Sequence, residues 1–196
     1  LTPDSAMVIS DHYKFNPHEK NEYIAFQVGH FKNGGNLELI NQELFELYSK
    51  TKLNILFVPI GNCPGHDDIL SLTWLKQNAK YPCEVLTADN LERIMGAIAL
   101  SKLFIGTSLH GIITAMSFAV PYVALNPSIS KLKNYIETWS PEPLNEIADF
   151  NEICTRSINA INVDKAILVK NANMQKDLVR ESFKKISAVI NNNSRE

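Results

Sequence analysis

The segment from Leu103 to Leu125 constrains the fold more than any other part of this 196-residue chain. Leu103–Ile105 and Tyr122–Leu125 are short, continuous apolar runs, which is the pattern of strands buried on both faces. Gly106 ends the first run, and the small residues within 115–119 suit a helix that packs closely on a sheet. The segment therefore predicts a strand, a tight turn, a helix and a second strand.

The rest of the chain alternates in the same way. Apolar runs are followed by segments with helical spacing; Leu39, Ile40, Leu44 and Leu47, for example, form one stripe. Strands that alternate with helices form a mainly parallel sheet covered on both faces, so we predict an α/β fold, a Rossmann-like three-layer sandwich. The expected strands are 23–28, 54–59, 84–86, 103–105 and 122–125, and the expected helices are 37–49, 68–78, 90–100, 109–119, 131–138, 150–160 and 163–190.

Three regions follow from this pattern. Residues 1–22 are polar and irregular, and we interpret them as a linker from a preceding N-terminal domain. Residues 23–190 are expected to form a single Rossmann-like domain, and residues 191–196 a frayed tail. Because the chain begins with neither an initiator Met nor a signal-peptide pattern, we interpret it as part of a longer protein.

Charge and composition exclude several classes of protein. A formal net charge of -2 and a pI near 6.2 argue against a nucleic-acid-binding protein, which needs clustered Lys and Arg. No apolar run approaches the roughly 20 residues that span a bilayer, so no transmembrane segment is expected. The 3 cysteines form no C-x-x-C pair, which favours a reducing compartment. No ligand set has metal-binding spacing, so no metal is expected.

The turn after the first of the two buried runs carries the residues most suited to chemistry. In a β-α-β unit, ligands bind at the carboxyl end of the first strand. A helix N-terminus there offers free backbone N–H groups and a partial positive charge, both suited to an anion. Thr107, Ser108 and His110 stand at this turn. The sequence therefore predicts an anionic substrate beside a histidine.

This segment resembles the signature of the polysaccharide pyruvyl transferase family. Residues 106–111 read Gly-Thr-Ser-Leu-His-Gly, and Val120-Pro121 leads the last strand. The resemblance extends from about Tyr23 to Leu132, and it includes Phe57-Val58-Pro59 followed by His66-Asp67-Asp68. One position departs from the family pattern, since Ser108 stands where the family usually has arginine.

The resemblance implies a function and an architecture. Family members transfer a pyruvyl group from phosphoenolpyruvate to a sugar and form a ketal on a cell-surface polysaccharide. They resemble two-domain GT-B transferases, of which this chain would be the C-terminal half. The implied partners are the phosphoenolpyruvate donor, a sugar or lipid-linked oligosaccharide acceptor, and the N-terminal domain of the same protein, with no cofactor. The implied location is the cytoplasm, with peripheral attachment at the inner membrane as a further option.

The residues, with the resemblance at His110 and Lys131, suggest roles for individual side chains. His110, with a reference pKa near 6.5, would be the acid or base, and Asp67 would be a second catalytic group. His66 could contact the acceptor, and Lys131, His30 and Lys32 could neutralise the donor. The structural alternatives are a histidine that caps a turn, solvated lysines, a plain connector over 28–36, and Asp68 as a helix N-cap. The expected substrate contacts are Gly106, Thr107, Ser108, Leu109, Gly111, Lys131, His30, Lys32 and His66.

Ser108 leaves two further functions open, because serine offers one neutral donor where an arginine fork would match phosphate or carboxylate. The first is a GT-B type glycosyltransferase domain that uses a nucleotide sugar. No acidic pair of the kind that holds a nucleotide ribose stands out in the sequence. The second is a non-catalytic domain that binds a sugar or a partner protein.

Overall fold

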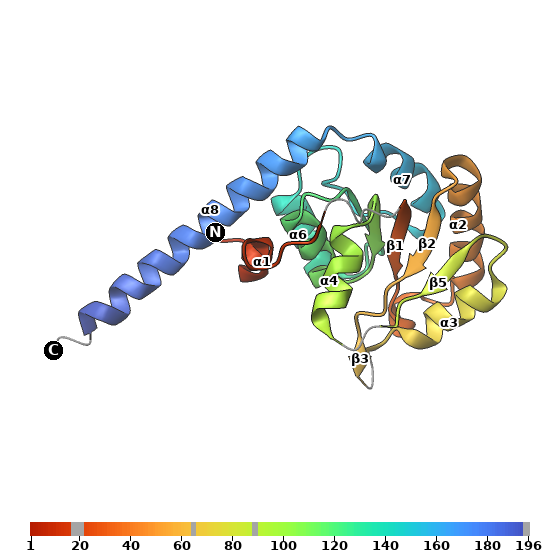
Figure 1. Ribbon diagram of the computed structural model, residues 1–196, viewed down its shortest axis with the longest axis horizontal. Coiled ribbons are helices and arrows are strands. Elements are labelled where there is room, and N and C mark those ends of the chain that lie inside the picture. Colours follow the sequence, from red (N-terminus) through yellow and green to blue (C-terminus); the bar gives the residue numbers. More distant parts are fainter. Residues whose placement is uncertain (17–21, 64–65, 88–89, 194–196) are drawn as a thin grey trace.

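The computed structural model describes residues 1–16, 22–63, 66–87 and 90–193. Its centre is a five-stranded sheet in the order β5-β2-β1-β6-β7, and every adjacent pair is parallel (Figure 1). A two-residue antiparallel pair, β3 and β4, stands apart from it. The strands are β1 (Tyr23–Gln27), β2 (Asn54–Phe57), β3 (Asn62–Cys63), β4 (His66–Asp67), β5 (Cys83–Val85), β6 (Leu103–Gly106) and β7 (Tyr122–Ala124).

Helices follow the strands and cover the sheet. The α-helices are α1 (Ile9–His12), α2 (Leu37–Thr51), α3 (Ile69–Asn78), α4 (Leu91–Ala99), α5 (Leu109–Ser117), α6 (Ser130–Trp139), α7 (Ile153–Ile161) and α8 (Lys165–Asn193). Short 3-10 helices are η1 (Ser5–Val8), η3 (His30–Lys32) and η4 (Phe150–Glu152). The predicted α/β fold with a mainly parallel sheet is therefore confirmed, with most boundaries shifted by one to three residues. The β3–β4 pair lies between the expected strand at 54–59 and the expected helix at 68–78, where no strand is predicted.

The order of the strands creates a switch point between β1 and β6. From β1 the chain passes through α2 to β2 on one side, whereas from β6 it passes through α5 to β7 on the other. Right-handed crossovers then place α2 and α3 on one face of the sheet and α4 and α5 on the other. Ligands of open α/β sheets bind outside the carboxyl ends of the strands at such a point.

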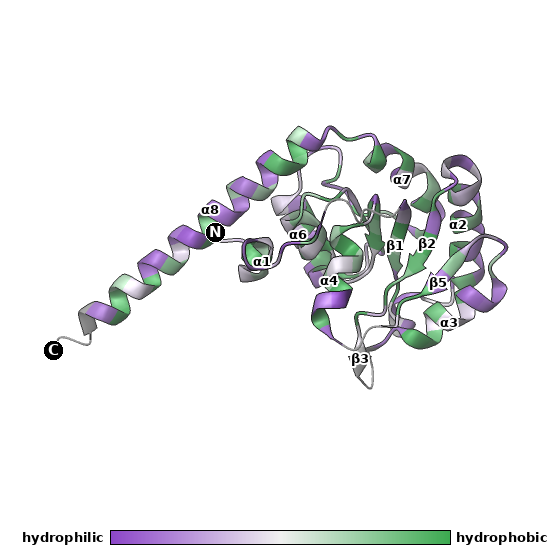
Figure 2. Ribbon diagram, in the orientation of Figure 1, coloured by the Kyte–Doolittle hydropathy of each residue, from purple (hydrophilic) through white to green (hydrophobic). Residues whose placement is uncertain are grey.

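The central strands are buried as their continuous apolar runs predict. Every residue of β1, β6 and β7 is buried, while β2 and β5 carry exposed or half-buried positions. Figure 2 colours the same ribbon by hydropathy. The rings of Phe26 and Phe57 pack edge to face, with centroids 6.0 Å apart. Phe104 is fully buried against α5, where a Cβ at Gly111 would lie 2.6 Å from its Cζ. This contact explains a glycine within the first turn of α5.

The N-terminal residues pack on the domain instead of passing over it. Residues 5–12 form η1 and α1, which contact α5, and Met7 is fully buried. The hydroxyl of Ser117 donates to the carbonyl of Met7 at 2.7 Å and accepts the N–H of Ser10 at 3.2 Å. The sequence analysis, which treats 1–22 as an irregular linker, does not include these turns because they are too short to show periodicity. A preceding domain stays a prediction.

The final helix, α8, extends beyond the residues with which it packs on the domain. It spans 29 residues, and its C-terminal part extends away from the rest of the molecule (Figure 1). Leu168, Ala172, Gln175 and Val179 are buried, which anchors its first half to the domain.

The Ser117 hydroxyl gives a direct test of N-terminal docking. Ser117→Ala leaves the Ser10 N–H and the Met7 carbonyl without this partner in a buried place, so we expect the free energy of unfolding to fall by about 1–3 kcal/mol. Ser49→Ala is the matched control, since Ser49 is exposed and its hydroxyl bonds only within its own helix, to the carbonyl of Phe45. Urea denaturation measures both, and equal effects would contradict the docking role.

Candidate functional site

The candidate site is the turn between β6 and α5, at the switch point of the sheet. Ser108 occupies the N-cap of α5, and its Oγ accepts the N–H of Gly111 at 3.2 Å. The hydroxyl proton of Ser108 stays available to a ligand, because a hydroxyl can accept and donate at once. A nine-residue helix thus begins at the carboxyl end of β6. The free N–H groups and the dipole of this helix N-terminus suit an anion, and the anion site itself stays a prediction.

His110 lies in the first turn of α5 and faces solvent. Its side chain is 72% exposed, and its Nε2 lies 4.0 Å from Oδ2 of Asp4. The Asp4 carboxylate also caps η1 by accepting the N–H of Ala6 at 2.8 Å. The N-terminal segment therefore borders the candidate histidine, which the sequence analysis does not foresee.

Thr107 is a structural part of the turn. It is fully buried, and both its N–H and its hydroxyl donate to Oε1 of Gln27, at 3.0 and 3.3 Å. Its Oγ1 also accepts the N–H of Gly29 at 3.2 Å. Thr107 therefore joins the ends of β1 and β6, and its polar donors are already engaged.

Gly106 and Gly111, two of the predicted substrate contacts, stand where close packing leaves no room for a side chain. A Cβ at Gly106 would lie 2.9 Å from Cζ of Phe104 and 3.0 Å from Oε1 of Gln27. A Cβ at Gly111 would meet Phe104 and Ile60. Both glycines bring the α5 turn against the sheet, so packing requires them whatever the ligand.

Gln27 and Asp68 complete a buried polar network that the sequence analysis does not identify. Gln27 is 2% exposed and ends β1, and its Nε2 donates to Oδ2 of Asp68 at 2.9 Å. The same Oδ2 accepts the N–H groups of Ile60 and Gly61, at 3.0 and 2.8 Å. The one sequence signal for Gln27 is a polar residue within the apolar run of the expected strand 23–28.

The expectation that the Asp68 side chain caps helix α3 is wrong. Asp68 holds the N-cap position, but its carboxylate makes no capping hydrogen bond. It turns instead toward the three N–H donors just described. Oδ1 of Asp67 accepts the N–H of Ile69 at 3.2 Å and takes over part of the capping role. Three donors outside the helix outcompete one helix N–H for the Asp68 carboxylate.

The loop after β1 is fastened to its neighbours. His30 is exposed, and its Nδ1 lies 3.4 Å from Oγ of Ser71. The carbonyl of Lys32 accepts the side-chain N–H of Asn126 at 2.8 Å, which ties the loop to the segment after β7. Gly34 and Gly35 have φ of 58° and 78°, so they serve left-handed turns. His30 and Lys32 therefore lie at the same edge of the sheet as the α5 turn.

Two predicted contacts lie at the periphery. Lys131 is exposed in the first turn of α6. His66 pairs with Cys63 in the β3–β4 hairpin, and the structure describes only its backbone. Leu109 opens α5 and packs partly against the core.

The described residues contain no group of three or more His, Cys, Asp or Glu side chains that could hold a metal ion. In the same part of the chain, no helix is long and apolar enough to cross a membrane.

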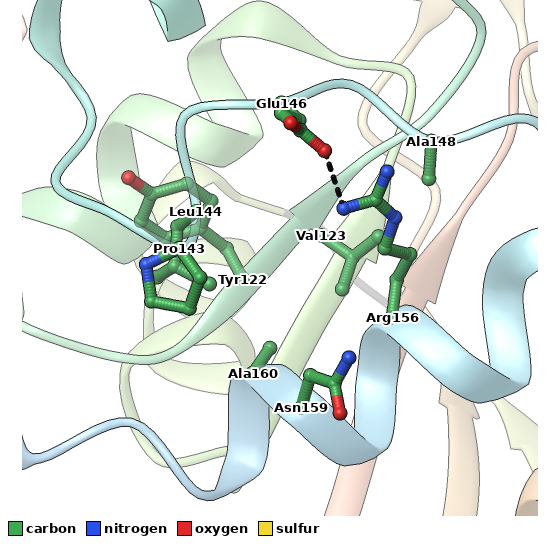
Figure 3. Close-up of a pocket in the computed structure, with 9 residues that line it drawn as sticks. All are labelled: Tyr122, Val123, Pro143, Leu144, Glu146, Ala148, Arg156, Asn159 and Ala160. Carbon is green, nitrogen blue, oxygen red and sulfur yellow. Dashed lines mark ion pairs between the residues drawn. The ribbon is translucent and has the colours of Figure 1, made fainter.

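A small cavity of about 40 Å³ lies away from this site, between β7, α7 and the 143–148 segment (Figure 3). Arg156 lines this cavity, and its guanidinium forms ion pairs with Glu146 at 2.6 Å and with Glu152 at 3.4 Å. These ion pairs neutralise the cation, so the cavity is no rival anion site.

Comparison with known families decides the relationship. A family model for polysaccharide pyruvyl transferase matches residues 1–129, which is most of the chain. The chain belongs to the polysaccharide pyruvyl transferase family. The match includes the N-terminal turns, all five strands of the sheet and the α5 turn. No curated protein matches the chain significantly.

Solved structures show that this family member has half of a GT-B type architecture. A putative UDP-N-acetylglucosamine 2-epimerase from Listeria monocytogenes matches with a TM-score of 0.67 and 11% identity, over 97% of this chain and 53% of that one. A UDP-GlcNAc 2-epimerase from Methanocaldococcus jannaschii matches with a TM-score of 0.60 and 12% identity, over 94% and 54%. The calicheamicin glycosyltransferase matches with a TM-score of 0.50 and 11% identity, over 89% and 43%. The chain thus spans about half the length of these structures.

The Gln27 amide offers a test of how the site of this pyruvyl transferase family member is held. Gln27→Met keeps the shape of the side chain but leaves the Thr107 N–H without its partner and removes one donor to Asp68. We expect the free energy of unfolding to fall by about 1–3 kcal/mol, because buried polar groups lose their hydrogen bonds. Gln42→Met, at an exposed position of α2, is the control and should change stability by less than about 0.5 kcal/mol. Chemical denaturation that finds the two variants equal would show that the network is dispensable.

Proposed function

We propose that this protein is a pyruvyl transferase that moves the pyruvyl group of phosphoenolpyruvate to two hydroxyls of a sugar on a cell-surface polysaccharide. One observation carries the proposal. The α5 turn sits at the switch point of the sheet, with helix N–H groups and the Ser108 hydroxyl at an anion-binding position and the exposed His110 beside them. Membership of the family supports the same reaction class.

The donor binds at this turn through its negative charge. Backbone N–H groups of the first turn of α5 and the Ser108 hydroxyl hold the phosphate or the carboxylate. Lys32 and His30 from the loop after β1, and Lys131 from α6, supply positive charge around the donor. Ser108 both caps the helix and contacts the anion, which is the role that an arginine fork would otherwise share.

His110 serves as the acid. Ketal formation needs a proton at the methylene carbon C3 of the donor while a sugar oxygen bonds to C2. An imidazolium beside the anion site can deliver that proton and recover it from the second hydroxyl. The acceptor, a sugar or a lipid-linked oligosaccharide, enters from a cleft shared with an N-terminal domain, and the enzyme works in the cytoplasm.

Donor binding is the first test. With phosphoenolpyruvate at about 100 times its Kd, the full-length protein should gain about 2.7 kcal/mol of stability. For a domain of this size the midpoint of thermal unfolding should rise by about 5–10 °C. Inorganic phosphate is the control for a nonspecific anion effect. A midpoint that rises with UDP-GlcNAc and not with phosphoenolpyruvate would instead support a nucleotide-sugar transferase, and no rise with either would contradict both functions.

The second test concerns His110. His110→Gln removes the proton donor but keeps a polar side chain at an exposed position, so folding should be unaffected. We expect kcat for ketal formation to fall by about 10²–10⁴-fold, with a change in phosphoenolpyruvate affinity of less than tenfold. His12→Gln, at an exposed histidine of α1, is the matched control. Mass spectrometry of the pyruvylated sugar measures the rate, and a His110→Gln enzyme as fast as the control would exclude the acid role.

A further inference from the structure

We infer that Asp68, and not Asp67, is the base that takes the proton from the attacking hydroxyl of the acceptor. The inference rests on the proposed function and assigns a residue that the reaction needs. Its starting point is an imbalance between the two oxygens of the Asp68 carboxylate.

The two oxygens have different surroundings. Asp68 is 3% exposed, and its Oδ2 accepts three hydrogen bonds, from Gln27, Ile60 and Gly61. Its Oδ1 accepts none from the residues that the structure describes. Oδ1 is not among the described buried side-chain atoms that lack a partner, which are Tyr122 Oη, Ser140 Oγ and Ser157 Oγ, so this oxygen stays open to an incoming hydroxyl. Three N–H donors on Oδ2 favour a charged carboxylate at this position, and they leave Oδ1 as the oxygen that can accept a proton.

The free oxygen lies at the switch point. Oδ1 of Asp68 is 3.4 Å from the position that a Cβ would take at Gly29, so the missing side chain leaves the oxygen uncovered there. The N–H of Gly29 donates to Oγ1 of Thr107, whose chain leads directly into the α5 turn. Asp68 and the donor turn thus flank the same residue at the end of β1. The Cδ of Lys32 lies 3.3 Å from the same point and brings a cationic side chain to this place.

Gln27 fixes which way the carboxylate faces. Its Oε1 receives the two donors of Thr107, so its Nε2 must point to Asp68. This amide therefore couples the anion-binding turn to the carboxylate. Gln27 acts as a positioning residue, because it reaches the reaction through Asp68 and Thr107.

Asp67 is less suited to the role. It is half-buried in β4, and its Oδ1 already accepts the N–H of Ile69. It belongs to the local turn before α3, with no hydrogen bond to the network at the ends of β1 and β6 among the residues described.

The assignment gives a balanced reaction. Oδ1 of Asp68 takes the proton of the first hydroxyl as its oxygen bonds to C2, and the C2–C3 electron pair takes a proton from His110 to form the methyl group. The second hydroxyl oxygen then bonds to C2 while the C2–O bond to phosphate breaks, and phosphate leaves with the electron pair. The neutral His110 takes the second hydroxyl proton, and Asp68 gives its proton to the departing phosphate. Both residues return to their starting states.

The experiment compares two variants of the full-length protein with the wild type. Asp68→Asn keeps an oxygen for the three N–H donors and replaces Oδ1 with a group that accepts no proton. Gly29→Ala places a methyl group in front of Oδ1 and leaves the carboxylate intact; the backbone there, with φ of -71°, accepts alanine. Asp67→Asn is the matched control. Thermal unfolding, calorimetry with phosphoenolpyruvate, and ketal formation on a mixture of methyl glucoside, galactoside and mannoside are measured for each.

We expect Asp68→Asn to lower kcat by about 10²-fold or more, which is the usual contribution of a general base. Gly29→Ala should reduce ketal formation by at least about tenfold, and both variants should keep the affinity for phosphoenolpyruvate within about threefold. Asp67→Asn should behave as wild type.

Different results would contradict the role of Asp68 and the proposed pyruvyl transfer. If the wild type forms ketal and either folded variant keeps its rate, Asp68 is not the base. Should Asp68→Asn fail to fold, Gly29→Ala alone decides, because it retains the carboxylate. If Asp67→Asn loses the rate instead, the base is Asp67. A wild type that neither binds phosphoenolpyruvate nor forms ketal contradicts the proposed function itself.

Discussion

The candidate site depends on one buried amide. Gln27 ends the central strand β1, and its two ends hold Thr107 and Asp68 in fixed orientations. Because a side-chain amide has one accepting and one donating end, its orientation is set as soon as Thr107 supplies two donors. Both the α5 turn and the loop before α3 are thus hydrogen-bonded to the end of β1. Gln27 therefore fixes the position of the Asp68 carboxylate relative to the α5 turn.

The sheet makes this arrangement possible through its order. The carboxyl ends of β1 and β6 are adjacent, but the connections that leave them run in opposite directions. Two loops lie at this edge of the sheet: the loop with His30 and Lys32 after β1, and the turn with Ser108 and His110 after β6. A UDP-N-acetylglucosamine 2-epimerase and a glycosyltransferase share this fold with the chain at 11% identity, so the fold by itself does not fix the reaction.

Much of the fold could be predicted from the sequence, because buried parallel strands need unbroken apolar runs and the helices between them need an apolar stripe. The runs at 103–105 and 122–125 identify β6 and β7, and the small residues within 115–119 indicate the helix between them. The N-terminal turns could not be predicted, since four-residue helices show no periodicity. Their docking depends on Met7 and on the Ser10–Ser117 contacts, which join residues 107 positions apart.

The sequence by itself determined the family and the α/β fold class, since each is encoded in continuous stretches of chain, and it predicts the α5 turn as the place for an anion. The tertiary structure decided what each polar residue near the turn does. Gln27, Asp68 and Thr107 lie in three separate segments, and only the folded sheet brings their donors and acceptors within hydrogen-bond distance. Local rules assign Asp68 to a helix cap, but its carboxylate binds three N–H donors outside the helix, two from the preceding loop and one from Gln27 of β1, in place of one helix N–H.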